Sequence, residues 1–337
     1  MRCDFCASSD LERIYQVRGS QRGMTAAVCQ RCGLIQSLRA HNYDPSKNPH
    51  SVAYHGQREI SASSGPTWGN IRHGKGLRLT RQQGLLAQVP WAQMAAVLDV
   101  GSNRGDFLRW LHHRRPTAEV LALEPDPLVL PYHPSIAAWA TVKNQRLEAS
   151  ELPPKHLEFV YCSHTLEHAD APSLMLRKIH AAMKPGALML LDVPNAEDLK
   201  NPNLVEEFFV DKHNFHFTPA LLQSYLGHVG FMVAADASDA YNLSYLLKRG
   251  GAVAGGEFSP ADSGAASRHT AMVKQYVQTL EQNRAKLRQV GETINFLAAR
   301  QTVVCWGGGR LFDALVEYGG LNPRTIAGVI DEHLSKY

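Results

Sequence analysis

Residues 97–105 read Val97-Leu-Asp-Val-Gly-Ser-Asn-Arg-Gly105, and this stretch decides the fold of the chain. Three apolar residues with Asp99 among them are typical of a buried parallel strand. Gly101 and Gly105 then enclose a short polar turn, after which apolar residues recur at helical spacing over 107–111. The stretch predicts a strand, a tight turn and a helix, so that a ligand can lie against bare backbone with its anionic end facing the N–H groups of the helix N-terminus.

Short apolar runs alternate with helical patterns around this turn and predict an α/β fold. The expected strands are 97–100, 120–124, a weaker run at 137–142, 159–162, 187–193 and a hairpin-like pair at 231–237 and 242–248. The expected helices are 77–89, 105–114, 173–183 and 218–230, the third ended by Lys184-Pro-Gly186. This alternation indicates a doubly wound, mostly parallel, Rossmann-like sheet, which binds ligands at the carboxyl ends of its strands.

Four of the six cysteines form two C-x-x-C pairs near the N-terminus, Cys3 with Cys6 and Cys29 with Cys32. Two such pairs predict a zinc ribbon with four thiolate ligands around a tetrahedral Zn²⁺. The alternative, a redox pair, would not need a second matching pair. Four protein ligands leave no open coordination position, so the ion is expected to be structural and to supply much of the folding free energy of a small module.

The remaining composition suggests further units along the chain. We expect a zinc-binding module at 1–45, a linker or cover segment rich in Pro, Gly and Ser at 46–76, the α/β domain at 77–249 and a C-terminal part at 268–337. The C-terminal part is expected to be one long helix from about 269 to 300, followed by a strand–glycine–helix–strand unit around Gly307–Gly309. A full doubly wound domain needs more strands, so this Rossmann-like unit is expected to be truncated or minimal, and a scaffold.

Bulk properties exclude several classes of protein. The chain has 337 residues, 44% hydrophobic and 20% charged, and a net charge of +4, which is too small to indicate a nucleic-acid partner. No apolar run approaches the roughly 20 residues of a membrane span, and the N-terminus lacks the layout of a signal peptide. We therefore expect a cytoplasmic protein with neither a membrane nor a nucleic acid as partner, and its oligomeric state stays open.

The strand and glycine turn at 97–105 could hold NAD, FAD, another nucleotide or S-adenosylmethionine. The dinucleotide pattern G-x-G-x-x-G is absent at this turn. Asp99 beside the turn would repel a pyrophosphate, whereas it would attract an aminium or sulfonium group. Glu124 ends the next strand about 20 residues later, where an acid can accept both ribose hydroxyls. These residues favour S-adenosylmethionine.

Several ordered segments resemble the successive motifs of class I S-adenosylmethionine-dependent methyltransferases. They are Asp99–Gly105, Glu124-Pro-Asp126, Phe159–His168 and Met183–Pro194. The resemblance implies that Gly101 and Gly105 pack on the methionine moiety, that Glu124 binds the ribose, that the loop at 147–149 faces the adenine and that Ser163 closes the methionine side. The implied cofactor-binding residues are Asp99, Gly101, Ser102, Gly105, Glu124, Pro125, Glu148, Ser163 and His164.

The order of units also resembles the sugar C-methyltransferases that act on nucleotide-linked deoxysugars. Those enzymes carry a His-Glu-His-type segment, which corresponds here to 211–219, and His213 matches the His proposed there as the base. Asp211 and Lys212 replace the first His and the Glu, so Asp211, Glu206 or Glu207 is the candidate acidic partner. His216 is the second candidate base. For both histidines the alternative is a hydrogen-bonding role in a lid or at the start of the helix after Thr218.

Three functions remain open on the sequence. The preferred one is methyl transfer from S-adenosylmethionine to a small polar acceptor, preferably a nucleotide-linked or glycan sugar, with a His base and a structural zinc. Such a transfer is an in-line displacement that needs no metal, and a base near neutral pKa is needed for a hydroxyl or an activated carbon. The alternatives are O- or N-methylation of another small metabolite, and a non-catalytic zinc-containing binding module.

Overall fold

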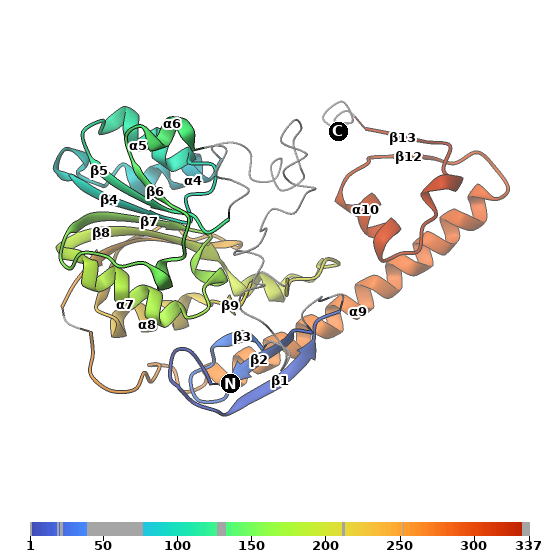
Figure 1. Cartoon of the computed structure of the whole chain (residues 1–337). Coiled ribbons are helices and arrows are strands. Elements are labelled where there is room, and N and C mark those ends of the chain that lie inside the picture. The colour runs from blue at the N-terminus through green and yellow to red at the C-terminus, as the bar shows by residue number, and fades with distance from the viewer. Residues whose placement is uncertain are drawn as a thin grey trace.

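The computed structural model describes residues 2–18, 20, 23–38, 77–126, 133–210, 213–251 and 253–331 (Figure 1). The expected linker at 46–76 and the two residues before His213 lie outside these ranges. The described strands form sheets of seven, four and two strands. None of the described helices combines the length and the apolar character that crossing a membrane requires.

The seven-stranded sheet has the order β10-β11-β8-β7-β4-β5-β6. Its strands are β4 (Ala96–Val100), β5 (Glu119–Leu123), β6 (Thr141–Lys143), β7 (Leu157–Ser163), β8 (Met183–Pro194), β10 (Phe231–Asp236) and β11 (Asn242–Arg249). Strand β4 is entirely buried and pairs in parallel with β5 on one side and β7 on the other. Strand β11 pairs antiparallel with both β8 and β10, which confirms the predicted hairpin-like pair.

Helices cover both faces of this sheet (Figure 1). Helices α4 (Leu77–Leu86), α5 (Asp106–Arg114) and α6 (Pro134–Ala137) lie on one face, and α7 (Pro172–Ala182) and α8 (Pro219–His228) lie on the other. Each face has its own apolar cluster, with Leu108 and Ile136 in one and Leu176 and Leu222 in the other. Short 3-10 turns at Trp91–Gln93, Leu147–Ala149 and Leu166–His168 complete the domain.

Two predicted elements differ from the structure. The weak strand expected at 137–142 is a helical turn, α6, followed by the short strand β6, because Pro134 starts a helix and the strand follows only at Thr141. The strand expected at 187–193 starts earlier, because β8 begins at Met183, which pairs with Leu157. Lys184-Pro-Gly186 therefore lies within the strand. The extra residues form a bulge, and Gly186 accommodates it with a φ of +79°.

The N-terminal module is a second sheet that the pattern of residues did not predict. It contains β1 (Leu11–Gln16), β2 (Thr25–Cys29) and β3 (Ile35–Leu38), and its fourth strand, β9 (Phe215–His216), comes from the distant 211–219 segment. The module packs on the α/β domain through Phe5, whose ring stacks on Tyr225 with centroids 3.6 Å apart. The segment that carries the candidate bases is therefore held between the two units.

The C-terminal part confirms the predicted long helix and strand–helix–strand unit. Helix α9 (Ala265–Ala298) packs against β1 and β2 and extends to β12 (Val304–Trp306), α10 (Arg310–Glu317) and β13 (Gly328–Ile330) (Figure 1). Strands β12 and β13 pair in parallel. Further 3-10 turns lie at Ala196–Lys200 and Pro323–Thr325.

Candidate active site

The glycine turn lies at the carboxyl end of β4, between β4 and α5. The backbone N–H groups of Gly101 and Ser102 both donate to the carbonyl oxygen of Leu123, at 2.8 and 3.1 Å, and so tie the turn to the end of β5. Gly101 has a φ of +75° and Gly105 a φ of +80°. Both angles lie in the left-handed region that favours glycine.

Packing requires glycine at Gly101 as well, whereas at Gly105 an added Cβ would meet the flexible end of a side chain. A Cβ atom on Gly101 would lie 2.3 Å from Thr165 Oγ1, and one on Gly105 would lie 2.1 Å from Ile136 Cδ1. The Thr165 side chain is held in place, because its single hydroxyl hydrogen is shared between the carbonyl oxygens of Val100 and Ser163. The turn is thus fixed closely against the loop that follows β7.

Glu124 lies at the end of β5, beside the turn. Its Oε2 accepts a 2.6 Å hydrogen bond from the N–H of Asn103, and its Oε1 accepts one of 2.9 Å from the N–H of Asp126. Asn144 donates to its carbonyl oxygen. The carboxylate is therefore held at the strand end, beside the glycine turn. Pro125, the next residue, is half-buried.

Asp99 is the second acid at this edge of the sheet. Its side chain is 1% exposed, and neither carboxylate oxygen has a hydrogen-bond partner among the described residues. Burial raises the pKa of Asp99 well above its usual range, and the charge of Glu124 raises it further. Ser102 Oγ is likewise buried without a described partner. These orphaned polar atoms fit a ligand that brings hydrogen-bond donors and a positive group to the turn.

A buried polar network connects α4 to the ends of β7 and β8. Gln82 donates to Asp192 Oδ2 at 2.7 Å and to Ser163 Oγ at 3.1 Å, and it accepts from Tyr161 OH at 2.7 Å. Ser163 also donates to Asp192, whose other oxygen accepts from Ser244. The Ser163 hydroxyl is therefore positioned from two sides. The sequence did not predict Gln82 as a site residue, because in the sequence it looks like any polar residue on a helix.

Histidines and one acid gather in the loop after β7. His164, with a φ of +49°, places Nδ1 3.5 Å from Glu167 Oε1 and Nε2 3.5 Å from Asp192 Oδ2. His168 Nε2 lies 3.5 Å from the same oxygen of Glu167, and its ring centroid is 4.8 Å from that of His213. The ligand-type atoms of Glu167, His168 and His213 all lie within 4.8 Å of one another.

The fold therefore connects His213 to the glycine turn through one loop. The N–H of Asn214 donates to the carbonyl oxygen of Glu167, and its amide group donates to the carbonyl oxygens of His168 and Ala169. The same loop carries Thr165, which contacts the turn. The pairing of His168 with His213 is absent from the sequence pattern, because the two residues belong to separate segments.

His216 is placed differently from His213. It is 4% exposed, lies on β9 and shares a 3.3 Å hydrogen bond between Nε2 and Ser37 Oγ. The rings of Phe208 and Phe209 pack against it, and burial lowers its pKa to about 3. Its ring centroid is 6.4 Å from that of His213. The imidazole is therefore neutral and enclosed at physiological pH.

Two other predicted site residues have partners in the structure. Glu148 accepts a hydrogen bond from the N–H of Asp170 at 3.0 Å. Glu207, a candidate acidic partner for His213, instead accepts from Tyr15 OH at 2.7 Å and from Tyr276 OH at 2.6 Å. Its carboxylate thus fastens the segment before His213 to β1 and α9.

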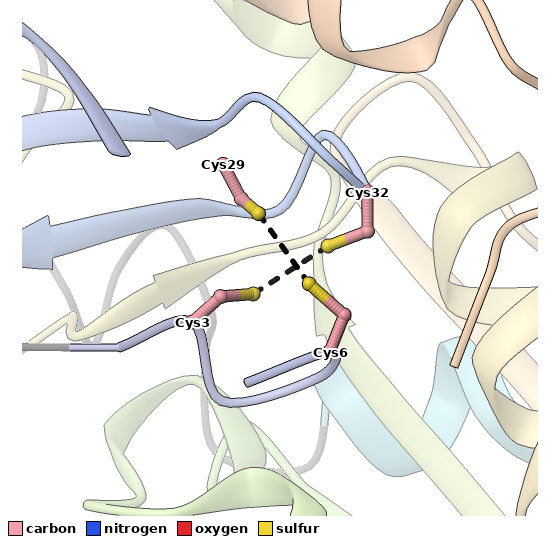
Figure 2. A group of neighbouring side chains, drawn as sticks. All are labelled: Cys3, Cys6, Cys29 and Cys32. Atoms are coloured by element: carbon pink, nitrogen blue, oxygen red, sulfur yellow. Dashed lines mark hydrogen bonds between the residues drawn. The ribbon is translucent and has the colours of Figure 1, made fainter. Parts of the chain in front are cut away.

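The two C-x-x-C pairs meet in one cluster (Figure 2). Cys3 Sγ lies 3.5 Å from Cys32 Sγ, Cys6 Sγ lies 3.5 Å from Cys29 Sγ, and all four sulfur atoms lie within 4.8 Å of one another. A tetrahedral Zn²⁺ with Zn–S bonds of about 2.3 Å would hold its sulfurs roughly 3.8 Å apart. All four side chains are buried. The donor set and the spacing fit a closed four-thiolate site.

Known proteins match the α/β domain. The profile of a family described as a methyltransferase domain matches residues 79–235. A curated tRNA U34 carboxymethyltransferase from Desulforapulum autotrophicum is 28% identical over 143 residues, which are 40% of this chain and 44% of that protein. The match therefore spans less than half the length of this curated relative.

Solved structures show likenesses over larger parts of the chain. The 1,6-didemethyltoxoflavin-N1-methyltransferase of Burkholderia thailandensis, bound to 1,6-didemethyltoxoflavin and S-adenosylhomocysteine, is 17% identical with a TM-score of 0.44, covering 71% of this chain and 100% of that one. An S-adenosylmethionine-dependent methyltransferase from Mesorhizobium loti is 16% identical with a TM-score of 0.43, covering 53% and 100%. Residues 79–235 are thus similar to a methyltransferase domain, and the order of the seven strands is that of a Rossmann-like α/β sheet.

Proposed function

We propose that this chain transfers a methyl group from S-adenosylmethionine to a small polar acceptor, preferably a nucleotide-linked or glycan sugar. The observation that carries the proposal is the single loop at 163–168, which contacts the glycine turn through Thr165 and the His213 segment through Glu167. A transfer reaction needs a cofactor turn and a base that are held by common contacts, as both are by this loop, because reactants held in line lose little further entropy.

Different residues at the glycine turn would bind different parts of the cofactor. Gly101 and Gly105 keep the backbone bare, and Glu124 would accept hydrogen bonds from the two ribose hydroxyls. Asp99, which lacks a described partner, would ionise beside an aminium group and gain a charge-assisted interaction. The cofactor supplies an activated methyl group on a sulfonium. Exclusion of water from this edge strengthens each of these electrostatic contacts.

His213 is the proposed base for the acceptor. Its ring lies beside that of His168, and Glu167 is 3.5 Å from His168 Nε2. Glu167 therefore supplies the negative charge that the sequence lacks immediately before His213. It would stabilise the protonated histidine pair after a proton leaves a hydroxyl or an activated carbon. General-base assistance of this kind contributes about 10²–10⁴ in rate.

The sugar preference rests on the order of the units, and the zinc on the four-cysteine cluster. We propose that Cys3, Cys6, Cys29 and Cys32 hold a structural Zn²⁺. The ion would keep the N-terminal sheet folded, and through the β3–β9 pairing it would position the segment that carries His213. It would take no part in the displacement itself.

Labelled S-adenosylmethionine and a panel of nucleotide sugars test the proposal. We expect the wild type to label at least one sugar, and His213→Asn to bind the cofactor with near wild-type affinity by calorimetry while its turnover falls about 10²–10⁴-fold. His113→Asn, at an exposed histidine on α5, is the matched control and should keep its turnover. Absence of cofactor binding would refute the reaction, whereas binding without transfer to any sugar would refute the acceptor class.

The same geometry would serve a hydroxyl or amine acceptor on another small metabolite. A histidine pair next to one carboxylate can accept a proton from oxygen, nitrogen or an activated carbon alike. Nuclear magnetic resonance of the product distinguishes these outcomes, since the shift of the labelled methyl carbon reports the atom to which it is bonded.

A further inference from the structure

Glu167, His168 and His213 form a cluster of possible metal ligands in addition to the four cysteines. Each offers one ligand-type atom, and the three atoms all lie within 4.8 Å of one another. Glu167 and His168 belong to the 3-10 turn after β7, whereas His213 comes from the segment before β9. The N–H of Asn214 donates to the carbonyl oxygen of Glu167 and so joins the two segments. The fold therefore assembles the three side chains before any ion binds.

The spacing within this cluster matches that between the ligands of a zinc ion. Glu167 Oε1 lies 3.5 Å from His168 Nε2. Zn²⁺ binds histidine nitrogen and carboxylate oxygen at about 2.1 Å, which separates two ligand atoms of a tetrahedral site by roughly 3.4 Å. An ion would therefore lie between the ligand atoms, which bury one another, and not in a cavity beside them. His213 is half-buried, so the cluster is accessible to an ion from this residue.

A further histidine supports the carboxylate of this cluster. His164 Nδ1 lies 3.5 Å from Glu167 Oε1, and His164 Nε2 lies 3.5 Å from Asp192 Oδ2. The backbone N–H of His164 also donates to the carbonyl oxygen of Asp192 at 2.7 Å. Groups around the direct ligands orient them, and the loss of such a group lowers metal affinity about 10–100-fold. Glu167 is therefore held from outside the cluster, as a metal-binding carboxylate needs.

The set of donor atoms indicates which kind of ion fits. Ca²⁺ and Mg²⁺ are bound by oxygen ligands, whereas two imidazoles with one carboxylate favour a divalent transition metal such as Zn²⁺. Three protein ligands leave the fourth position of a tetrahedral site open. The cluster thus differs from the four cysteines, which would close the coordination sphere of their ion.

We propose that Glu167, His168 and His213 bind Zn²⁺ reversibly, and that the bound ion inhibits methyl transfer. A neutral imidazole has one nitrogen with a free lone pair. When a metal ion takes this lone pair, His213 has none left with which to accept a proton from the acceptor. The inhibition rests on the proposed function, because it requires His213 to be the base, whereas the zinc site itself does not depend on the reaction.

Calorimetric titration of the full chain with Zn²⁺ tests the site, once one equivalent has been supplied for the four cysteines. We expect the wild type to bind one further equivalent, and His168→Asn to bind it more than about tenfold more weakly. Glu167→Gln, which keeps the shape of the side chain, repeats the test if His168→Asn folds poorly. His113→Asn removes an exposed histidine on α5 and should bind zinc as the wild type does. Absence of a further equivalent in the wild type, or equal affinity for it in all variants, would refute the site.

Methyl transfer to the panel of nucleotide sugars, measured over the same zinc concentrations, tests the inhibition. Wild-type turnover should fall as the further equivalent binds and recover when dilution releases the ion. Unchanged turnover at zinc concentrations that fill the site would overturn the inhibition. Transfer to no sugar in the absence of added zinc would overturn the proposed function and the inhibition with it, while the titration decides the zinc site separately.

Discussion

Replacing His216 by glutamine should remove an acid-sensitive part of the stability of this protein. Burial lowers the pKa of His216 to about 3, whereas an exposed histidine in the unfolded chain has a pKa of about 6.5. As the pH falls below 6.5, the unfolded chain binds a proton that the folded chain does not. The free energy of unfolding therefore falls on acidification, from about pH 6.5 down to about pH 3.

The expected magnitude follows from the two pKa values. The limiting slope is about 1.4 kcal/mol per pH unit, so His216 should cost about 1.4 kcal/mol of stability between pH 7.5 and pH 5.5. Glutamine does not titrate, and its amide can still interact with Ser37 Oγ, which His216 Nε2 contacts at 3.3 Å. His216→Gln should therefore lose less stability than the wild type over this range, whatever its stability at pH 7.5.

Urea unfolding of the full chain at pH 7.5, 6.5 and 5.5 measures this difference. The comparison is between wild type and variant at each pH, since titrations common to both then cancel. His113→Gln is the control and should reproduce the pH dependence of the wild type. An identical pH dependence in His216→Gln and wild type would contradict the reasoning, because it would mean that folded His216 takes up its proton as the unfolded residue does.

Three further substitutions test the turn and the cysteine cluster. Asp99→Asn should raise the thermal midpoint of the ligand-free chain at pH 7.5 but not near pH 4, because the raised pKa of buried Asp99 makes folding less favourable once the carboxyl ionises in the unfolded chain. In calorimetry the same substitution should weaken S-adenosylmethionine binding about tenfold. Gly101→Ala should lower stability and cofactor affinity more than Gly186→Ala does. Both positions have positive φ, but only at Gly101 would the added Cβ lie 2.3 Å from Thr165. Equal losses in the denaturation midpoint would contradict the packing argument. Cys29→Ser should reduce bound zinc, measured by metal analysis, and destabilise the N-terminal sheet by more than about 2 kcal/mol. Cys305→Ser is the control and should keep its zinc. An unchanged metal content in Cys29→Ser would refute the four-thiolate site.

The local pattern of residues was sufficient for most of the α/β domain. Strand β4 is buried on both faces and therefore reads as a short apolar run, and the glycines after it are needed for a positive φ that follows from local backbone sterics. The two C-x-x-C pairs predict that the four cysteine side chains lie together, because two cysteine pairs at that spacing are typical of a metal site. The bulge in β8 escaped prediction because Lys184-Pro-Gly186 also has the composition of a turn, and only pairing with β7 decides between the two.

The sequence alone therefore determined the elements whose cause is local: the strand and turn at 97–105, the acid at Glu124, the order of strands and helices, and the two C-x-x-C pairs. Only the tertiary structure decided which distant groups meet. It joined residues 215–216 to the N-terminal sheet, enclosed His216 and set His168 beside His213 with Glu167 as the acid. The reason is physical, because burial and contact between separate segments depend on how whole units pack, and no periodicity along the chain records that packing.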